Sequence, residues 1–377
     1  MTMIACTINK AAPVIIGDLL ISDSTKPDKF VTPVLTEDVL QHLSADSKLH
    51  PIRLDQKIYI LKPNVCIAFS GTVYYISKFL EDISIFCKAK ETVNLEEMNR
   101  FLEGYKGADS LRYFSCIILI IEKEQEHFNV GRIMHGKWMG AESEIFGDVF
   151  ASGSGSLDFL KEVKQNVKIR SQFPSDDINY TLQVNIITIC KLLAGERLTL
   201  NSVKRHWGAG FEMIYFNGDH FTKLDNITYI INQGRFNDDG SITEVPVPAI
   251  ILHYKYHREL LVITVIRSNR GTTQVTDTHI IISCKDYAIF QFIVAPINYQ
   301  GSENFEELAK NVSFTSTKNA MAYLFETKGG YYLPASFNPS AELEITYNHP
   351  DSLEVKMLKG INDILVSEAT AAFKNFK

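Results

Sequence analysis

The 377-residue sequence lacks the features that would indicate a secreted or membrane-spanning protein. Its uninterrupted apolar runs, such as Cys116–Ile121, fall far short of the roughly 20 residues that span a bilayer. Met1–Cys6 has neither the basic region nor the apolar region of a signal peptide. We therefore expect a cytoplasmic protein with no membrane partner.

Cysteine motifs and basic clusters are also missing. No two of the six cysteines form a C-x-x-C pair, so the sequence indicates neither a zinc site nor a disulfide framework. Most of them lie in apolar, strand-like segments, where buried free thiols are expected. The formal net charge of −6 argues against the basic stripe that binds nucleic acids, so no nucleic-acid partner is expected.

The chain does have enough apolar residues for a large core. Because 45% of its residues are hydrophobic, a disordered chain is excluded. At roughly 100–200 residues per domain, the length predicts two or three domains. A change in sequence pattern near residue 233 suggests two, with boundaries at 1–232 and 233–377.

The first domain begins with short apolar runs that predict strands. Between the second and third of these runs, the polar stretch 23–56 is predicted to be mostly an exposed insertion, with a short helix around Glu37–Leu43. The four predicted strands are Met3–Asn9, Val14–Ser22, Lys57–Leu61 and Val65–Phe69.

After Gly71 the apolar residues recur at helical spacing, and helices and strands then come in groups. This order favours an α+β fold with four layers, two sheets between two pairs of helices, over an alternating parallel sheet. Helices are predicted after Gly71 and at Leu95–Tyr105, Leu157–Val167 and Asp177–Leu193. Strands are predicted at Phe114–Ile121, His127–Ile133, Val149–Ser152, Phe211–Phe216 and Thr222–Leu224.

The second domain is predicted to be rich in strands, and its role is not indicated by any motif. Its predicted strands are Ala249–His253, Leu260–Arg267, His279–Cys284 and Ile289–Ala295, and its predicted helices are Phe305–Val312, Lys318–Glu326 and Ile361–Phe376.

Residue 2 is the first candidate for chemistry. Threonine is small enough for the initiator Met1 to be removed by methionine aminopeptidase chemistry, which would leave Thr2 at the amino terminus. Its hydroxyl and its α-amino group would then lie on one residue. An α-amino group titrates near 7.7–8.0, so it can serve as a base beside the nucleophile.

Several later motifs follow Thr2, and the intervals between them fit the pattern of a known family. Gly17-Asp18 lies in the second predicted strand, with Asp18 16 residues after Thr2, and Lys57 precedes Gly71 by 14 residues. Gly-rich turns follow at Ala151–Ser156 and Trp207–Gly210. Over roughly residues 2–231, the sequence resembles the proteasome β-type subunits, and more closely their HslV-like relatives, which are N-terminal-nucleophile (Ntn) hydrolases with an αββα sandwich.

The resemblance implies that Thr2 supplies the nucleophilic oxygen and that its own amine shuttles the proton. It also implies that Lys57 lies beside the Thr2 hydroxyl and lowers its pKa. Asp18 would pair with Lys57, because a buried cation needs an opposite charge.

Further residues have supporting roles by the same resemblance. The backbone N–H of Gly71 would stabilise the oxyanion, and Ser154 would form a hydrogen bond with the Thr2 amine. Gly153 and Gly155 would allow the backbone to approach closely. The substrate pocket would include Ile21, Ser22 and Phe69. An extended peptide would pair with the strand beside Ser22. The resemblance also implies a homo-oligomer, of which a ring is one form.

His253 and His257 have the four-residue spacing of metal ligands on a helix. They lie between two strand-like runs without a third ligand nearby, so a hairpin is the preferred interpretation and neither a metal nor a cofactor is predicted. Three functions stay open: a threonine peptidase acting on peptides or proteins, an inactive Ntn-fold scaffold or interaction protein, and an Ntn hydrolase of small amides.

Overall fold

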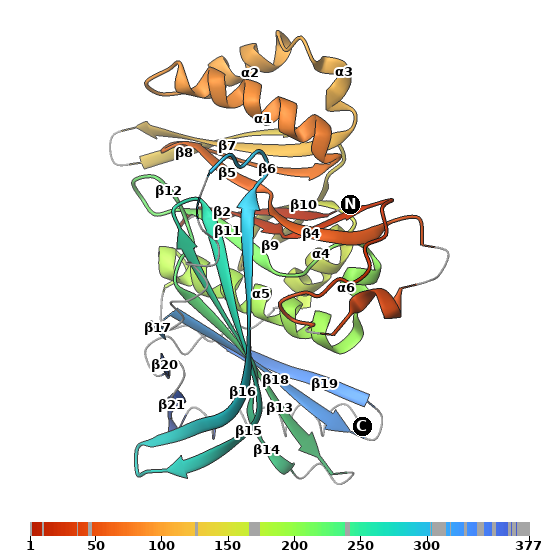
Figure 1. The fold of residues 1–377 in the computed structure, drawn as a ribbon. Helices are drawn as coiled ribbons and strands as arrows, with labels where there is room; N and C mark the ends of the chain where they lie inside the picture. The colour runs from red at the N-terminus through yellow and green to blue at the C-terminus, as the bar shows by residue number, and fades with distance from the viewer. Residues whose placement is uncertain are drawn as a thin grey trace.

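The protein has a mixed α+β fold, seen here in a computed structural model (Figure 1). The structure describes residues 2–9, 11–35, 37–43, 47–124, 127–165, 174–237, 242–301, 303, 314–316, 318–327, 330–337, 343–348, 352–360, 363 and 367. Met1, the predicted helix Phe305–Val312 and most of the predicted helix Ile361–Phe376 lie outside these residues.

A four-stranded antiparallel sheet, in the order β5-β6-β7-β8, carries three helices on one face (Figure 1). Its core contains Phe69, Ile118 and Phe79, with Phe79 contributed by the first helix. The apolar period of that helix therefore arises from burial of one side against this sheet. The elements are β5 (Ile58–Lys62), β6 (Val65–Gly71), β7 (Phe114–Glu124), β8 (His127–His135), α1 (Val73–Lys88), α2 (Leu95–Glu103) and α3 (Ala108–Leu111).

A six-stranded antiparallel sheet faces the first sheet across a second core, which contains Ile15, Cys66 and Ile117. Helices α4 (Ser156–Gln165) and α5 (Ile178–Thr199) cover its other face. The strands, in sheet order, are β12 (Phe221–Lys223), β11 (Phe211–Phe216), β2 (Pro13–Asp18), β1 (Met3–Ile8), β10 (Gly147–Gly153) and β9 (Met139–Ser143). Only β9 has no counterpart among the predicted strands.

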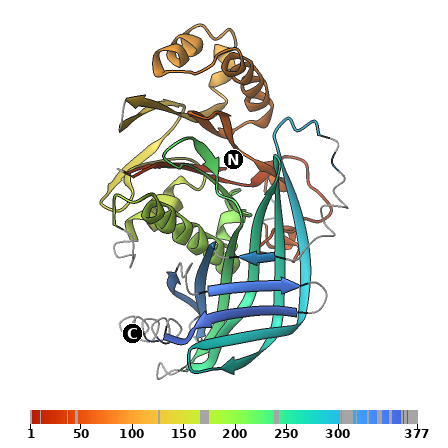
Figure 2. The ribbon, with the colours of Figure 1, turned by 90° about the vertical axis from the view of Figure 1, so that its left-hand side faces the viewer.

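A third, C-terminal sheet packs against the opposite side of α5 (Figures 1 and 2). Its longest strands extend from the bottom of the molecule to the N-terminal sheets, as Figure 2 shows. The strands, in order of pairing, are β17 (Phe314–Ser316), β20 (Leu343–Asn348), β21 (Ser352–Leu358), β16 (His279–Pro296), β15 (Leu260–Val275), β14 (Ile242–His257), β13 (Ile227–Phe236), β18 (Lys318–Thr327) and β19 (Gly330–Phe337).

The predicted helix Lys318–Glu326 is wrong, because this segment is strand β18 and pairs in parallel with β13. Ala320, Ala322 and Leu324 pack into the core shared with α5, whereas Met321 and Tyr323 pack into the core on the opposite face. A strand buried on both faces is apolar throughout, so periodicity cannot separate it from a buried helix.

Strand β13 crosses the predicted boundary between residues 232 and 233. It begins at Ile227, so the last strand residues of the predicted first domain already belong to the C-terminal sheet. Two strands predicted separately, at 279–284 and 289–295, are one long strand, β16. The two parts of the chain therefore share a core around α5.

The insertion 23–56 is less exposed than predicted. Phe30, Val34 and Val39 are buried against the rest of the protein. The short helix is confirmed as the single 3-10 turn η1 (Val39–His42). Strand β4 (His50–Gln56) pairs with β3 (Leu20–Asp23) and also with the end of β16, which joins the insertion to the C-terminal sheet.

None of the helices within the described residues is long and apolar enough to cross a membrane. The six cysteines are buried free thiols, as predicted; they are Cys6, Cys66, Cys87, Cys116, Cys190 and Cys284.

Candidate active site

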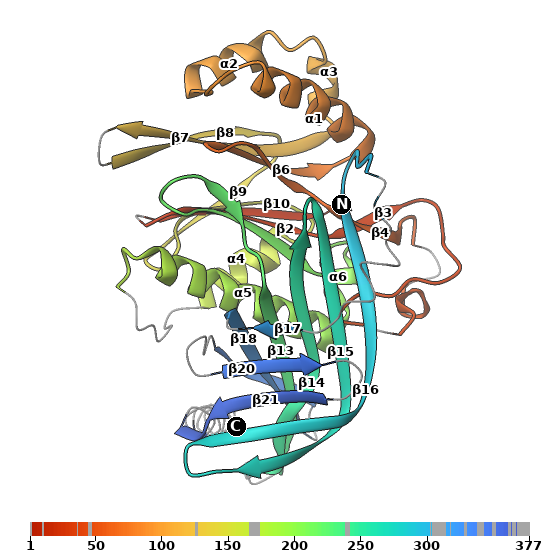
Figure 3. The same cartoon turned by 60° about the vertical axis from the view of Figure 1, so that its left-hand side comes forward.

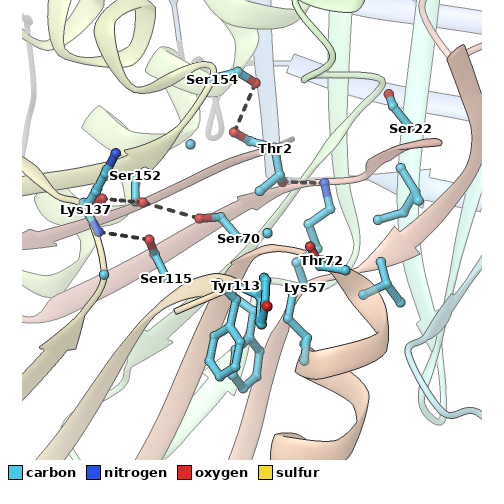
Figure 4. A pocket seen from close by; sticks show the side chains of 18 of the residues that line it. Thr2, Ser22, Lys57, Ser70, Thr72, Tyr113, Ser115, Lys137, Ser152 and Ser154 are labelled. Carbon is cyan, nitrogen blue, oxygen red and sulfur yellow. Dashed lines mark hydrogen bonds between the residues drawn. The ribbon is translucent and has the colours of Figure 1, made fainter. Parts of the chain in front are cut away.

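Thr2, Asp18 and Lys57 meet in a buried cluster where β1 begins and β2 ends, in the middle of the six-stranded sheet; Figure 4 shows Thr2 and Lys57 side by side. Lys57 Nζ donates to Thr2 Oγ1 at 2.5 Å and to Asp18 Oδ1 at 2.6 Å, while the Thr2 hydroxyl donates to the same Asp18 oxygen. All three residues are at most 2% exposed. Residues 16 and 55 positions apart therefore form one hydrogen-bonded cluster.

The Lys57 ammonium has three donors, and all of them are used. The third goes to the carbonyl oxygen of Leu20 at 2.6 Å. Burial lowers the pKa of Lys57, and the Asp18 carboxylate opposes that shift. The ammonium is thus fixed with one N–H directed at the threonine oxygen, where its charge would favour the ionised hydroxyl.

Asp18 is held from both sides of its carboxylate. Oδ1 accepts from the backbone N–H of Met3 at 2.9 Å, and Oδ2 accepts from the backbone N–H of Gly208 at 2.8 Å. Strand β2 ends at this residue because Leu19 N–H bonds to the carbonyl oxygens of Gly208 and Gly210 in place of a strand partner. The expected continuous strand Val14–Ser22 is therefore divided into β2 and β3.

Glu196, from the last turn of α5, fixes the turn that contains Gly208. Its Oε2 accepts from Ala209 N–H at 2.7 Å and from Ser202 at 3.2 Å, and its Oε1 accepts from Thr32 at 3.3 Å. Gly208 has a φ of +100°, and a Cβ there would lie 2.2 Å from Glu196 Oε2, so only glycine fits. Burial raises the pKa of Glu196 to about 7.

Glu212 positions the backbone at Lys57. Its Oε1 accepts from the N–H of Lys57 at 2.6 Å and from the N–H of Ile58 at 3.1 Å. Its Oε2 accepts from Lys223 and from the Tyr256 hydroxyl, both at 3.2 Å. Because Tyr256 belongs to β14, the C-terminal sheet contributes to the position of Lys57.

A cavity of about 980 Å³ opens beside the cluster (Figure 4). Thr2 and Lys57 line it, and so do the residues expected in the substrate pocket, namely Ile21, Ser22 and Phe69. The insertion also reaches the cavity through Leu49, Ile52 and Arg53.

Gly71 lines the same cavity at the end of β6, directly before α1. Its φ is +133°, and a Cβ would lie 2.6 Å from the Phe114 Cα, so the backbone here requires glycine. The N-terminus of α1 adds a partial positive charge at this place.

The glycine-rich turn at 153–155 approaches Thr2 as expected, but the serine contact differs. Gly153 has a φ of +95°, and a Cβ would lie 1.9 Å from the Thr2 carbonyl oxygen. A Cβ at Gly155 would lie 2.6 Å from the Trp207 ring and 2.8 Å from the Met3 side chain. The Ser154 hydroxyl donates to the Thr2 carbonyl oxygen at 3.4 Å, whereas the family resemblance implies a contact with the Thr2 amine.

The cavity wall opposite Lys57 is polar. The hydroxyls of Ser70 and Ser152 lie 3.3 Å apart, and Ser152 also donates to the carbonyl oxygen of Lys137 at 2.6 Å (Figure 4). The N–H of Lys137 in turn donates to Ser115. These contacts link strands from the two facing sheets along one side of the cavity.

Sequence reasoning missed Glu196 and Glu212. Glu212 is the single charged residue of the apolar run Phe211–Phe216, which is a usable signal because a buried charge needs a partner. Glu196 lies among ordinary helix residues and gives no comparable signal.

Within the described residues, no cluster of three or more His, Cys, Asp or Glu side chains could hold a metal ion. The interpreted hairpin is present, but His253 and His257 both lie in its strand β14, and the turn to β15 follows His257. His253 bonds to Thr228 and stacks on Phe314, and burial lowers its pKa to about 3. No protein-family model matches the chain, and no curated protein matches it.

Proposed function

We propose that the protein is an N-terminal threonine hydrolase that cleaves peptide amide bonds through an acyl-threonine intermediate, on an Ntn-type αββα sandwich. The observation that carries the proposal is the buried contact of Lys57 Nζ with Thr2 Oγ1 at 2.5 Å, at the wall of a large cavity. A hydroxyl facing a fixed ammonium resembles an activated nucleophile more than a core threonine.

The proposed reaction starts after removal of Met1, which lies outside the described residues. Thr2 Oγ1 attacks the substrate carbonyl carbon while its α-amino group accepts the hydroxyl proton. The same amine then gives the proton to the leaving nitrogen as the C–N bond breaks. Water hydrolyses the remaining ester, and the Gly71 N–H stabilises the oxyanion in both steps.

A peptide substrate is supported by the edge of β3. Among the described strands, β3 pairs with β4 alone, and Ile21, Ser22 and Asp23 line the cavity. The Ser22 hydroxyl is buried and has no hydrogen-bond partner within the described part of the chain. An extended peptide that adds a strand here would satisfy backbone groups and lie beside Thr2.

The test combines intact mass with covalent labelling. Removal of Met1 is expected to appear as the mass of a chain beginning at Thr2, and a β-lactone probe is expected to add one equivalent at that residue. Thr2→Ala should abolish labelling and lower peptide turnover by at least about 10³-fold, whereas Thr2→Ser keeps a hydroxyl and retains labelling. Thr25→Ala is the matched control, since it changes an exposed threonine that does not line the cavity.

Other results would select the competing functions. A retained Met1, or absence of labelling after its removal, would support an inactive scaffold or interaction protein. Turnover of small acyl amides without turnover of peptides would support a small-amide hydrolase. A homo-oligomer is proposed as well, and light scattering of the purified chain measures it.

A further inference from the structure

The segment that follows β16 enters the cavity next to the candidate active site. Ile297 lines this cavity together with Thr2 and Phe69, although it directly follows β16 of the C-terminal sheet. In Figure 3 the end of β16 rises past the six-stranded sheet to the level of β6 and α1. The part of the chain for which the sequence suggests no role therefore contributes one residue, Ile297, to the cavity lining.

Ile297 packs into the core of the four-stranded sheet and not into the core of the C-terminal sheet that precedes it. It is 7% exposed and belongs to the buried group that contains Phe69, Ile76 and Phe114. The Phe69 ring meets the Phe114 ring edge-on, with 5.9 Å between the centroids. These apolar side chains offer no charged partner, and Ile297 closes the space beside them.

Two sets of hydrogen bonds fix this segment. The Ile297 N–H donates to the Tyr59 hydroxyl at 2.9 Å, and that hydroxyl donates to the carbonyl oxygen of Gln56 at 2.7 Å, directly before Lys57. The Asn298 side chain donates to the Ser77 carbonyl oxygen at 2.9 Å and accepts from the Ser77 hydroxyl. The segment is thus attached both to β5 and to α1.

The end of β16 is also fixed by contacts with β4. Pro296 is in parallel register with Gln56 of β4, and the Gln56 side chain donates to the carbonyl oxygens of Val294 at 2.7 Å and Glu259 at 2.6 Å. Asn298 adopts a φ of +69°, a left-handed conformation that turns the chain at this place. Ile297 is consequently held in one position relative to Thr2.

We infer that Ile297 is a specificity-determining residue. It limits the depth of the apolar end of the cavity, so that this end accepts an aliphatic side chain of the residue whose carbonyl is attacked and disfavours a bulky aromatic one. The inference rests on the proposed hydrolase function for the identity of the bound group. It adds that the C-terminal sheet, through Ile297, selects the substrate.

The first measurement is turnover of fluorogenic peptides Ac-Ala-Ala-X-aminomethylcoumarin, with X as Ala, Leu or Phe. In Ile297→Ala, the ratio of kcat/KM for Phe to that for Leu should rise about tenfold or more, because removed methylene groups make room in the pocket. Ile297→Trp should lower the ratio for Leu to Ala by a similar factor. Ile297→Val is the milder variant and should shift the Phe-to-Leu ratio in the same direction as alanine.

Ile85→Ala is the matched control, because Ile85 is 61% exposed on α1 and does not line the cavity. Its ratios should stay within twofold of those of the native protein. Turnover with unchanged side-chain preference in every Ile297 variant would overturn the inference while leaving the hydrolase proposal intact.

Equilibrium binding separates the two proposals if turnover is absent. Ac-Ala-Ala-X-NH2 peptides are titrated into Thr2→Ala protein, with and without the Ile297 substitutions. A preference for Leu over Phe that Ile297→Ala removes would support the role of Ile297 even without hydrolysis. No binding of any peptide and no turnover would overturn both.

Discussion

Asp18 and Glu196 accept hydrogen bonds from two successive backbone amides, Gly208 N–H at 2.8 Å and Ala209 N–H at 2.7 Å. The turn at Gly208 therefore connects two buried carboxylates on its two sides. Asp18 contacts Thr2 and Lys57 directly, whereas Glu196 acts on them through this turn. Glu196 is accordingly a positioning residue for the candidate site.

Glu196→Gln should change how stability depends on pH. Burial raises the pKa of Glu196 from 4.5 to about 7, so the folded protein binds this proton more tightly than the unfolded chain. The contribution of Glu196 to stability is then greatest below about pH 4.5 and declines as pH rises to about 7, by about 3 kcal/mol in total. Glutamine lacks this decline, and urea unfolding at pH 5, 6, 7 and 8 measures the difference.

The difference in unfolding free energy between Glu196→Gln and the native protein should therefore be small at pH 5. As pH rises, the variant should become the more stable of the two. The amide oxygen can still accept from Ala209 and Ser202, and the amide nitrogen can donate to Thr32. The comparison at pH 5 serves as the internal control for lost contacts. Two parallel stability curves over this range would contradict the assignment.

Asp18→Asn should destabilise the protein by about 3–5 kcal/mol, because it leaves the buried Lys57 ammonium without its counter-ion. The double substitution Asp18→Asn with Lys57→Met removes both charges, and it should be more stable than Asp18→Asn alone. Urea unfolding of Asp18→Asn, Lys57→Met and the double variant measures the coupling between the two residues.

The exposed ion pair between Arg100 and Glu96 provides the contrast for this pair. Glu96→Gln breaks a pair whose side chains are both mostly exposed, and no measurable loss of stability is expected. If Asp18→Asn were as stable as Glu96→Gln, the buried pair would have no special part in holding Lys57.

Gly153→Ala should displace Thr2. The added Cβ would lie 1.9 Å from the Thr2 carbonyl oxygen, and the φ of +95° is itself unfavourable for alanine. A displacement of about 1 Å can cost about 100-fold in rate, so labelling of Thr2 should slow by at least this factor. Time-resolved mass spectrometry of the β-lactone adduct measures the rate.

Gly195→Ala is the glycine control. This residue lies within α5, and apart from its chain neighbours and the adjoining helix backbone no atom lies within 4 Å of the Cβ that alanine would add. Alanine should stabilise the helix by about 0.5–1 kcal/mol and leave labelling unchanged. Equal effects of the two substitutions would show that the turn at Gly153 does not position Thr2.

Site residues could be predicted from the sequence where their types and spacing are characteristic. Residues whose hydrogen-bond partner is a backbone group could not be predicted. Thr2, Asp18 and Lys57 could be selected because their distances along the chain match a family pattern, and the structure brings them together. The contact of Glu212 with the Lys57 N–H joins positions 155 residues apart. Because nearly every residue has a backbone N–H, the types of the donating residues do not show that a carboxylate accepts from their amides.

Helix α5 shows why the arrangement of the two parts of the chain could not be predicted. Its sequence was interpreted as a helix covering one sheet, but residues on all its sides are buried, including Asn185, Ile187 and Cys190. A helix that is buried all round lies inside a core. Burial by a second sheet depends on a partner segment, β18, whose own sequence was interpreted as helical.

The chain 1–232 should consequently not fold as an independent domain. Without the C-terminal sheet, α5 would expose the apolar side chains that pack against β13, β18 and β19, and Gln56 and Glu212 would lose their partners Val294 and Tyr256. We expect this fragment to aggregate or to unfold without cooperativity in urea, whereas the full chain unfolds cooperatively under the same conditions. A cooperative transition together with β-lactone labelling of Thr2 in the fragment would contradict this, because it would show that the N-terminal sheets hold the site unaided.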